Sequence, residues 1–223
     1  MATPIITLRG FQGEIELNQI KRYMGMGGVD LEGELYDTVN ECRPILMNSI
    51  NAKACYLETS VSITGNLVDV EYFKVESHNL AVVLKGCSKA ILMCATLGPQ
   101  VDMLIRREGV KSKARAVVIN SIAIAAIESY VSEINKLLKD EYKELNLRPR
   151  YSPGYGDLKL STQRELLSVL DSNRKIGVAL SDTFLMTPEK SVSAIIGLAE
   201  DGCLHIDKDC DICSKADCEY RLK

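Results

Sequence analysis

The sequence predicts an α+β fold, in which a mainly antiparallel sheet is packed with helices that include one long central helix. Three observations favour this class. Ser112 to Tyr142 has apolar residues at helical spacing throughout, and the stripe they form is wide enough for a core helix. The first third of the chain mixes short strand-like and helical runs, and Gly65-Asn66 is expected to make a turn between two strands. No internal repeat or low-complexity linker divides the 223 residues, so we expect one compact domain.

Six runs are predicted to be strands from their apolar and β-branched content. Cys55 to Thr64 alternates apolar and polar residues, and Leu67 to Val75 is its expected hairpin partner. Lys89 to Thr96 is mostly apolar, as in a buried strand. We therefore expect neighbouring strands to be antiparallel. In chain order, the expected strands cover residues 4–8, 55–64, 67–75, 89–96, 176–180 and 192–198.

Six further segments have helical spacing or clear helix signals. Ser77 is a good N-cap for a short helix. In the segment from Ser161 to Leu170, the leucines are expected to face the core, and Gln163, Arg164 and Glu165 to face solvent. In chain order, the expected helices cover residues 18–24, 32–49, 77–86, 98–107, 112–142 and 161–170.

Composition excludes several classes of function. The formal charge of −3 and the pI of about 5.6 give no basic balance that would favour nucleic acid or an anionic membrane. No apolar run reaches the roughly 18 residues that span a bilayer, and the first ten residues do not resemble a signal peptide. We therefore expect a cytoplasmic protein. Only two histidines are present, so a histidine-based catalytic triad is not expected.

The eight cysteines fall into two groups. Four lie in apolar or helical contexts and are predicted to be small buried hydrophobes: Cys42, Cys55, Cys87 and Cys94. The other four fall in the last 21 residues, within a tail at 201–223 that follows the main domain at 1–200: Cys203, Cys210, Cys213 and Cys218. Thiolates are soft ligands, and four within tetrahedral reach suit zinc or an iron–sulfur cluster. The spacing fits no single known finger, so free thiols remain the alternative.

The stretch from Leu147 to Leu160 has the clearest signs of a binding site. Its prolines fix the backbone locally, and Gly154 permits angles or a close approach that a side chain would forbid. Arg150 presents a planar fork of donors that suits a carboxylate. We therefore predict a rigid turn that holds a ligand. The alternative is structural: Arg150 would cap the long helix or pair with a surface acid.

Several motifs resemble one family. Arg150 to Tyr155 (RYSPGY) resembles the R-P-A-P-G-Y segment of the activation domain of cobalamin-dependent methionine synthase. Ile176 to Ser193 resembles the family's I/M-x-L-T-E-S-F-x-M-x-P-x-x-S-V-S stretch, in the same order. Arg22-Tyr-Met-Gly25 and Ala95-Thr-Leu-Gly-Pro99 are similar to stand-alone family members, so the matches extend over residues 18–199.

This resemblance implies a function in reactivation. The family domain binds S-adenosylmethionine and docks on the cobalamin-binding module of the synthase. One electron, from a donor such as flavodoxin or ferredoxin, and one methyl group then convert inactive cob(II)alamin to methylcobalamin. The partner would be that module or another corrinoid protein, which carries the cobalamin. The reduced cobalt supplies the nucleophile, so no catalytic residue of this chain is expected and the domain has only to position the methyl group.

The resemblance also implies a set of binding residues. Arg150 should clamp the methionyl carboxylate, and Ser152 stands where the family has an alanine whose backbone contacts the ligand. Gly154 would let the chain approach, and Tyr155 would place its ring or hydroxyl beside the ligand. The position of a family aspartate is occupied here by Gly25.

Two glutamates complete the implied site. Glu128 and Glu144 match family glutamates, although each has a plain structural alternative. Glu128 lies on a helical row with Ser121, Ala125, Ser132 and Asn135, which could be an ordinary solvated stripe. Glu144 lies near a helix end among charged residues. A second class of function therefore stays open, in which a metal-bearing redox or assembly protein kept the fold without binding S-adenosylmethionine.

Overall fold

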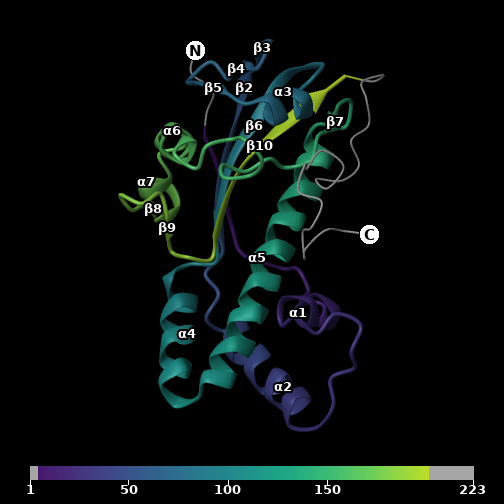
Figure 1. Ribbon diagram of the computed structural model, residues 1–223, viewed down its shortest axis with the longest axis vertical. Helices are drawn as coiled ribbons and strands as arrows, with labels where there is room; N and C mark the ends of the chain where they lie inside the picture. Colours follow the sequence, from purple (N-terminus) through teal and green to yellow (C-terminus); the bar gives the residue numbers. More distant parts are fainter. Residues whose placement is uncertain (1–4, 201–223) are drawn as a thin grey trace.

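The computed structural model describes residues 5–200, and it has a five-stranded sheet at its centre. The strand order is β1-β2-β6-β10-β7, and every neighbouring pair is antiparallel. The long helix α5, Lys113–Glu141, runs beside this sheet (Figure 1). The predicted fold class is confirmed. The strands are β1 (Ile6–Arg9), β2 (Lys53–Ser60), β6 (Cys87–Thr96), β7 (Asn146–Leu147) and β10 (Ser191–Ala199).

Both faces of the sheet are buried. Successive side chains of a strand point to opposite faces, and the central strands have consecutive apolar residues, so each face of the sheet is apolar. In β6, Ile91 and Met93 belong to one apolar cluster, and Leu92 and Cys94 belong to another. The two clusters lie on opposite sides of the sheet, so helices are needed on each side. The protein therefore has the layered form of a sheet between helices.

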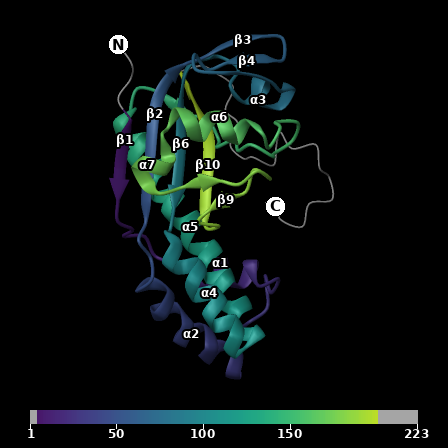
Figure 2. The ribbon, with the colours of Figure 1, turned by 90° about the vertical axis from the view of Figure 1, so that its left-hand side faces the viewer.

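The first layer is built around α5. Three helices contact it: α1 (Leu17–Tyr23), α2 (Gly33–Met47) and α4 (Pro99–Lys111). They gather at one end of the molecule, beyond the ends of the strands (Figure 2). The buried carboxylate of Glu108 receives hydrogen bonds from Lys111 and Arg115, which joins α4 to α5. By length and composition α5 could cross a membrane, but 61% of its apolar window is buried inside the protein, as in a core helix.

The second layer is smaller and carries the elements near the predicted turn. It contains α3 (His78–Val83), α6 (Thr162–Val169) and α7 (Ser172–Ile176), which cover the other face of the sheet. Two small sheets adjoin them. One has three strands, β3 (Ser62–Thr64), β4 (Leu67–Asp69) and β5 (Lys74–Glu76), and the other pairs β8 (Ala179–Leu180) with β9 (Met186–Thr187).

Three expected strands differ from the structure. The run from 55 to 64 divides into β2 and β3, because β2 pairs with β6 along its whole length and β3 turns away to pair with β4. The run from 67 to 75 divides into β4 and β5 around Glu71, whose φ is +67°. Residues 176–180 hold the end of α7 and the start of β8. Ile176, the last residue of α7, and Val178 are both buried in the second apolar cluster. Gly177 between them ends α7 with a φ of +77°.

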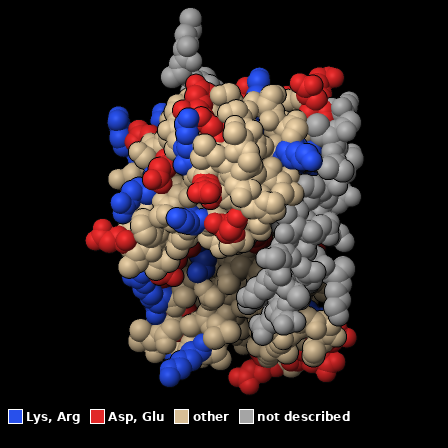
Figure 3. Space-filling view, turned by 45° about the horizontal axis from the view of Figure 1, so that its top comes forward, with Lys and Arg blue, Asp and Glu red and all other residues tan. Residues whose placement is uncertain are grey.

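The charge pattern agrees with the small net charge of the chain. Figure 3 shows Lys and Arg interspersed with Asp and Glu on the face it presents. Within residues 5–200, Cys42, Cys55, Cys87 and Cys94 are buried and free, which confirms their prediction. The four terminal cysteines lie outside the described residues.

Candidate functional site

The turn predicted as a ligand holder is fixed to the central strand β10. Tyr151 and Ile195 exchange two backbone hydrogen bonds of 2.9 Å each, and Arg148 N donates to Gly197 O at 2.8 Å. Residues 148–151 therefore continue beside β10 past the end of β7. Tyr151 is buried in the second apolar cluster, so Arg150 and Ser152 point to the opposite side, where α5 lies.

The far half of the turn is fixed to α3. Asp157 accepts hydrogen bonds from the Ser77 hydroxyl and from the backbone N–H groups of His78 and Asn79. Partial burial acts to raise the pKa of Asp157, but these donors outweigh it and hold the pKa below the usual value of 3.8. Asp157 therefore satisfies the free N–H groups at the start of α3, and the turn is held at both ends.

Two glycines allow the chain to turn here. Gly154 has a φ of +93°, and its N–H donates to Leu158 O at 2.8 Å. Gly156 has a φ of +51°, and a Cβ there would lie 2.5 Å from Asn79 Nδ2. Both angles favour glycine. Gly154 shapes the turn, as predicted, and is not among the residues that line the pocket described next.

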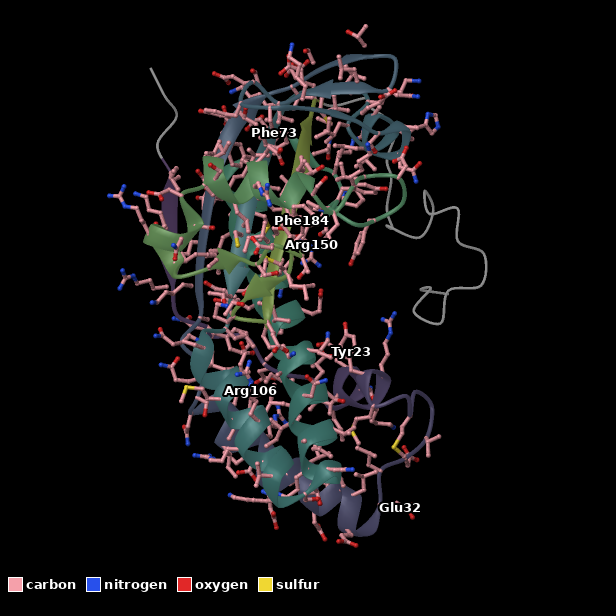
Figure 4. The ribbon with its side chains drawn as sticks, turned by 60° about the vertical axis from the view of Figure 1, so that its left-hand side comes forward. Tyr23, Glu32, Phe73, Arg106, Arg150 and Phe184 are labelled. Atoms are coloured by element: carbon pink, nitrogen blue, oxygen red, sulfur yellow. The ribbon has the colours of Figure 1, made fainter. Side chains whose placement is uncertain are left out.

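A pocket of about 230 Å³ lies between the turn, α5 and β10. Arg150 and Glu128 line it together, and Arg150 Nη2 is 3.2 Å from Glu128 Oε2. The exposed fractions are 19% for the arginine side chain and 37% for the glutamate, so the pair is part-buried and still open to a ligand. Figure 4 shows Arg150 at the level of the sheet, above the helical end of the molecule. The other lining residues are Ser152, Pro153, Tyr155, Gln163, Met186, Ser191, Val192 and Ser193.

The wall formed by β10 is polar. Ser191 and Ser193 both line the pocket, and the Ser191 hydroxyl donates to Thr96 Oγ1 at 2.8 Å. Gln163 lies behind Ser193, whose hydroxyl donates to Gln163 Oε1 at 3.4 Å. The expectation that Gln163 faces solvent is wrong: its exposed fraction is 5%. The amide is buried because it has two hydrogen-bond partners, one in β10 and one in the β8–β9 hairpin, and periodicity of apolar residues does not reveal such partners.

Two tyrosines flank the charged pair. Tyr155 is 55% exposed, and its ring meets the edge of Tyr151 with 6.3 Å between centroids. Tyr23, at the end of α1, has its pKa raised by partial burial and then by the negative charge of Glu128, so it lies within the electrostatic range of that carboxylate. The main chain of Tyr23 is held by the Ser121 hydroxyl, which donates to its carbonyl at 3.2 Å. Tyr23 was not predicted as a site residue, although it lies inside the Arg22-to-Gly25 motif.

The remaining predicted residues have different surroundings. Glu144 is exposed between α5 and β7 and does not line the pocket. Glu128 does not lie on a fully solvated stripe, because Ser121 and Ala125 of the same row are buried. Within residues 5–200, the structure has no cluster of three or more His, Cys, Asp or Glu side chains that could hold a metal.

The chemistry of the pocket is that of recognition. The described residues that line it include one cation, one carboxylate, three hydroxyl-bearing serines, an amide and a tyrosine, with no histidine or cysteine. Outside the pocket, burial raises the pKa of the Cys55 thiol to about 12, which disfavours its reactive thiolate form. The fold and the pocket together define an α+β domain with a small polar pocket that has one positive and one negative side chain in its wall.

Comparison with known proteins finds one family model that matches part of the chain. Residues 126–203 match the model of the family described as vitamin B12 dependent methionine synthase, activation domain. The match includes Glu128, Arg150 and Tyr155, and it confirms the resemblance predicted from the sequence.

A solved structure shares the fold. A crystal structure described as the MetH reactivation domain bound to AdoHcy matches with a TM-score of 0.69, at 11% sequence identity, over 91% of this chain and 80% of that chain. At this identity the likeness shows a common fold. No curated protein matches the sequence.

Proposed function

We propose that this domain binds S-adenosylmethionine and supports the reductive remethylation of inactive cob(II)alamin to methylcobalamin on a cobalamin-binding partner. The observation that carries this proposal is the Arg150–Glu128 pair inside the pocket. A methionyl group is a zwitterion, so it requires a donor fork for its carboxylate and an acceptor for its ammonium. Arg150 supplies the first and Glu128 the second.

The size of the pocket indicates which end of the ligand it takes. Its volume of about 230 Å³ is below the roughly 300–1,000 Å³ typical of pockets that enclose a whole small molecule. The methionyl end therefore fits inside, while the nucleoside and the sulfonium lie toward the open mouth beside Tyr155. This placement leaves the methyl group accessible to a second protein.

The chain acts by positioning. When the partner supplies cobalamin and an external donor of the flavodoxin or ferredoxin class supplies one electron, the methyl cation passes from the sulfonium to cobalt, and S-adenosylhomocysteine remains in the pocket. The residues of this chain bind and orient the methyl donor, and positioning of this kind can lower a barrier by several kcal/mol. AdoHcy is also the ligand named in the structural relative, which supports a site for this product.

The partner is a cobalamin-binding module of methionine synthase or a related corrinoid protein, and the setting is the cytoplasm. The test is a reactivation assay with a synthase that lacks its own activation domain and has been driven to the cob(II)alamin state. Adding this protein, S-adenosylmethionine and a one-electron reductant should restore turnover, and omission of any one should abolish it. Failure to restore turnover with any corrinoid partner, despite binding of S-adenosylmethionine, would remove the reactivation role.

A second proposal concerns the tail at 201–223. The Cys203-x6-Cys210-x2-Cys213-x4-Cys218 spacing supports a bound zinc ion or iron–sulfur cluster. These residues lie outside the described part of the chain, so the proposal rests on spacing alone. Metal analysis and visible absorption of anaerobically purified protein test it. Absorption near 400 nm with about four irons supports a [4Fe–4S] cluster, and metal-free protein with four titratable tail thiols would contradict both forms.

A further inference from the structure

The β8–β9 hairpin has a tip, residues 181–185, that stands next to the pocket. Met186, which follows the tip, lines the pocket, and Leu185 is 63% exposed. The tip is closed by its own hydrogen bonds: Ser181 N donates to Leu185 O, and the N–H groups of Phe184 and Leu185 donate back to Ser181. The conformation of this tip therefore determines where Met186 stands in the pocket wall.

Phe184 is the strained residue of the tip. Its φ is +61°, a left-handed angle that a residue with a Cβ adopts only when its surroundings hold it there. The closure between Ser181 and Leu185 is that of a three-residue hairpin loop, which favours a left-handed angle at its third residue. Because that angle still costs energy for a phenylalanine, contacts from outside the tip stabilise it.

Gln163 supplies one of these contacts. Its side-chain Nε2 donates to the carbonyl of Phe184 at 3.1 Å, and its Oε1 accepts from the Ser193 hydroxyl. The amide is buried at 5% exposure and lines the pocket itself. A second contact comes from Arg164, whose guanidinium lies 5.0 Å from the centre of the Phe184 ring. The first turn of α6 therefore contacts both the carbonyl and the ring of the strained residue.

The amide also fixes the direction of a pocket hydroxyl. Because Ser193 donates to Gln163 Oε1, the oxygen of Ser193 keeps its lone pairs free to accept from a ligand. The same glutamine therefore orients an acceptor on β10 and restrains the hairpin that carries Met186. These are two walls of one pocket, joined through a single side chain.

We propose that Gln163 is a positioning residue, which holds the strained tip of the β8–β9 hairpin and the Ser193 hydroxyl in the arrangement that binds the ligand. The effect of Gln163 on ligand binding rests on the proposed function. Its effect on the hairpin tip does not need a ligand, and it is therefore tested first in the ligand-free protein.

The test compares variants that remove the hydrogen bonds of Gln163 with variants that relieve or keep the backbone strain at Phe184. Gln163→Met keeps the length of the side chain and removes both hydrogen bonds. Glycine adopts a positive φ without cost and alanine does not, so Phe184→Gly and Phe184→Ala both remove the ring and differ only by a Cβ. Hydrogen exchange of the amides of Ser181, Phe184 and Leu185 is measured in ligand-free protein for each single variant and for both double variants, with thermal unfolding as the check on global stability.

We expect Gln163→Met to speed exchange at the three amides by about tenfold, with little change in the melting temperature. Adding Phe184→Gly should restore most of the protection, and adding Phe184→Ala should not. A role limited to packing would lower the melting temperature and would give the same result with glycine and alanine. Unchanged exchange in Gln163→Met, or equal rescue by glycine and alanine, overturns the proposal.

Ligand binding is then measured with S-adenosylmethionine on the same proteins. We expect Gln163→Met to weaken binding by about tenfold and Phe184→Gly to recover part of it. If the wild type does not bind, the proposed function fails, while the exchange experiment still decides the role of Gln163. If the wild type binds and Gln163→Met binds equally well, Gln163 does not position the ligand site.

Discussion

Arg150 Nη2 and Glu128 Oε2 lie 3.2 Å apart, and this contact joins the turn after β7 to the middle of α5. In the ligand-free protein the two charges satisfy each other. Under the proposed function, the ligand exchanges this pairing for one between its carboxylate and Arg150 and one between its ammonium and Glu128.

Binding measurements can show whether Glu128 contacts the ammonium or the sulfonium of the ligand. If Glu128 accepts from the ligand ammonium, Glu128→Gln should weaken S-adenosylmethionine and S-adenosylhomocysteine by the same factor, roughly tenfold, because both ligands carry that ammonium. Titration calorimetry with the two ligands measures this. Loss of affinity for S-adenosylmethionine alone would show that Glu128 faces the sulfonium, and unchanged affinity for both would remove Glu128 from the site.

The turn should depend on the absence of a side chain at position 156. Gly156→Ala places a Cβ within 2.5 Å of Asn79 Nδ2 at a φ of +51°, so we expect a loss of about 1–3 kcal/mol in the free energy of unfolding. Gly28→Ala is the matched control, since Gly28 also has a positive φ, +84°, and nothing lies within 4 Å of its added Cβ. Chemical denaturation compares the two. Equal stability of both variants would show that the turn does not need this approach to α3.

Asp157 should give the turn a dependence on pH. Its pKa is lowered in the folded protein, so the stability it contributes is present above its unfolded pKa of about 3.9 and is lost as the pH falls through the lower, folded pKa. Asp157→Asn should therefore cost about 1 kcal/mol at pH 7, as loss of a capping carboxylate does.

The difference in stability between wild type and Asp157→Asn should begin to narrow once the pH falls below about 4, where the carboxyl of the unfolded chain becomes protonated. It should be lost below the folded pKa, where the native carboxyl is protonated too. Thermal unfolding at several pH values measures this, and Asp37→Asn on the exposed side of α2 is the control. A difference that persists undiminished at low pH would show that Asp157 acts through its shape and not through its charge.

A substitution at Gly25 is expected to strengthen ligand binding. The resemblance places a family aspartate here, and Gly25 is exposed, has a φ of +75° and leaves open space for a Cβ. It lies two residues after Tyr23, whose pKa is raised by partial burial and by the charge of Glu128. Gly25→Asp should tighten binding of S-adenosylmethionine several-fold. Gly25→Asn tests the contribution of charge, because both side chains tolerate left-handed angles. Equal or weaker binding by the aspartate variant would mean that the position does not reach the ligand.

Much of the fold could be predicted from the sequence, because its largest elements have strong local signals. The long apolar stripe of α5 and the N-cap Ser77, which accepts from Leu80 N, are confirmed. Ser112 also caps α5 by accepting from Arg115 N, and this cap was not predicted. The short strands near residues 67–75 and 176–180 were harder, because a run of buried apolar residues looks the same in a strand, a helix end or a turn.

The site could be predicted only where a motif marked it. Arg150, Ser152, Tyr155 and Glu128 do line one pocket. Gln163 was missed, because a polar residue on an amphipathic helix is expected to face solvent unless its hydrogen-bond partners are known, and those partners are 30 and 21 residues away. Tyr23 was missed for the same reason: its proximity to Glu128 arises from the packing of α1 against α5.

The most direct test of the account is calorimetry with S-adenosylmethionine on the wild type, Arg150→Ala and Arg174→Ala. Arg174 is 85% exposed on α7 and lies outside the pocket, so its variant controls for the loss of one positive charge. We predict that the wild type and Arg174→Ala bind with equal affinity and that Arg150→Ala shows no measurable binding, while all three retain the same melting temperature within a few degrees. Absence of binding by the wild type, or full affinity in Arg150→Ala, would contradict the central claim that this turn holds the methionyl end of the ligand.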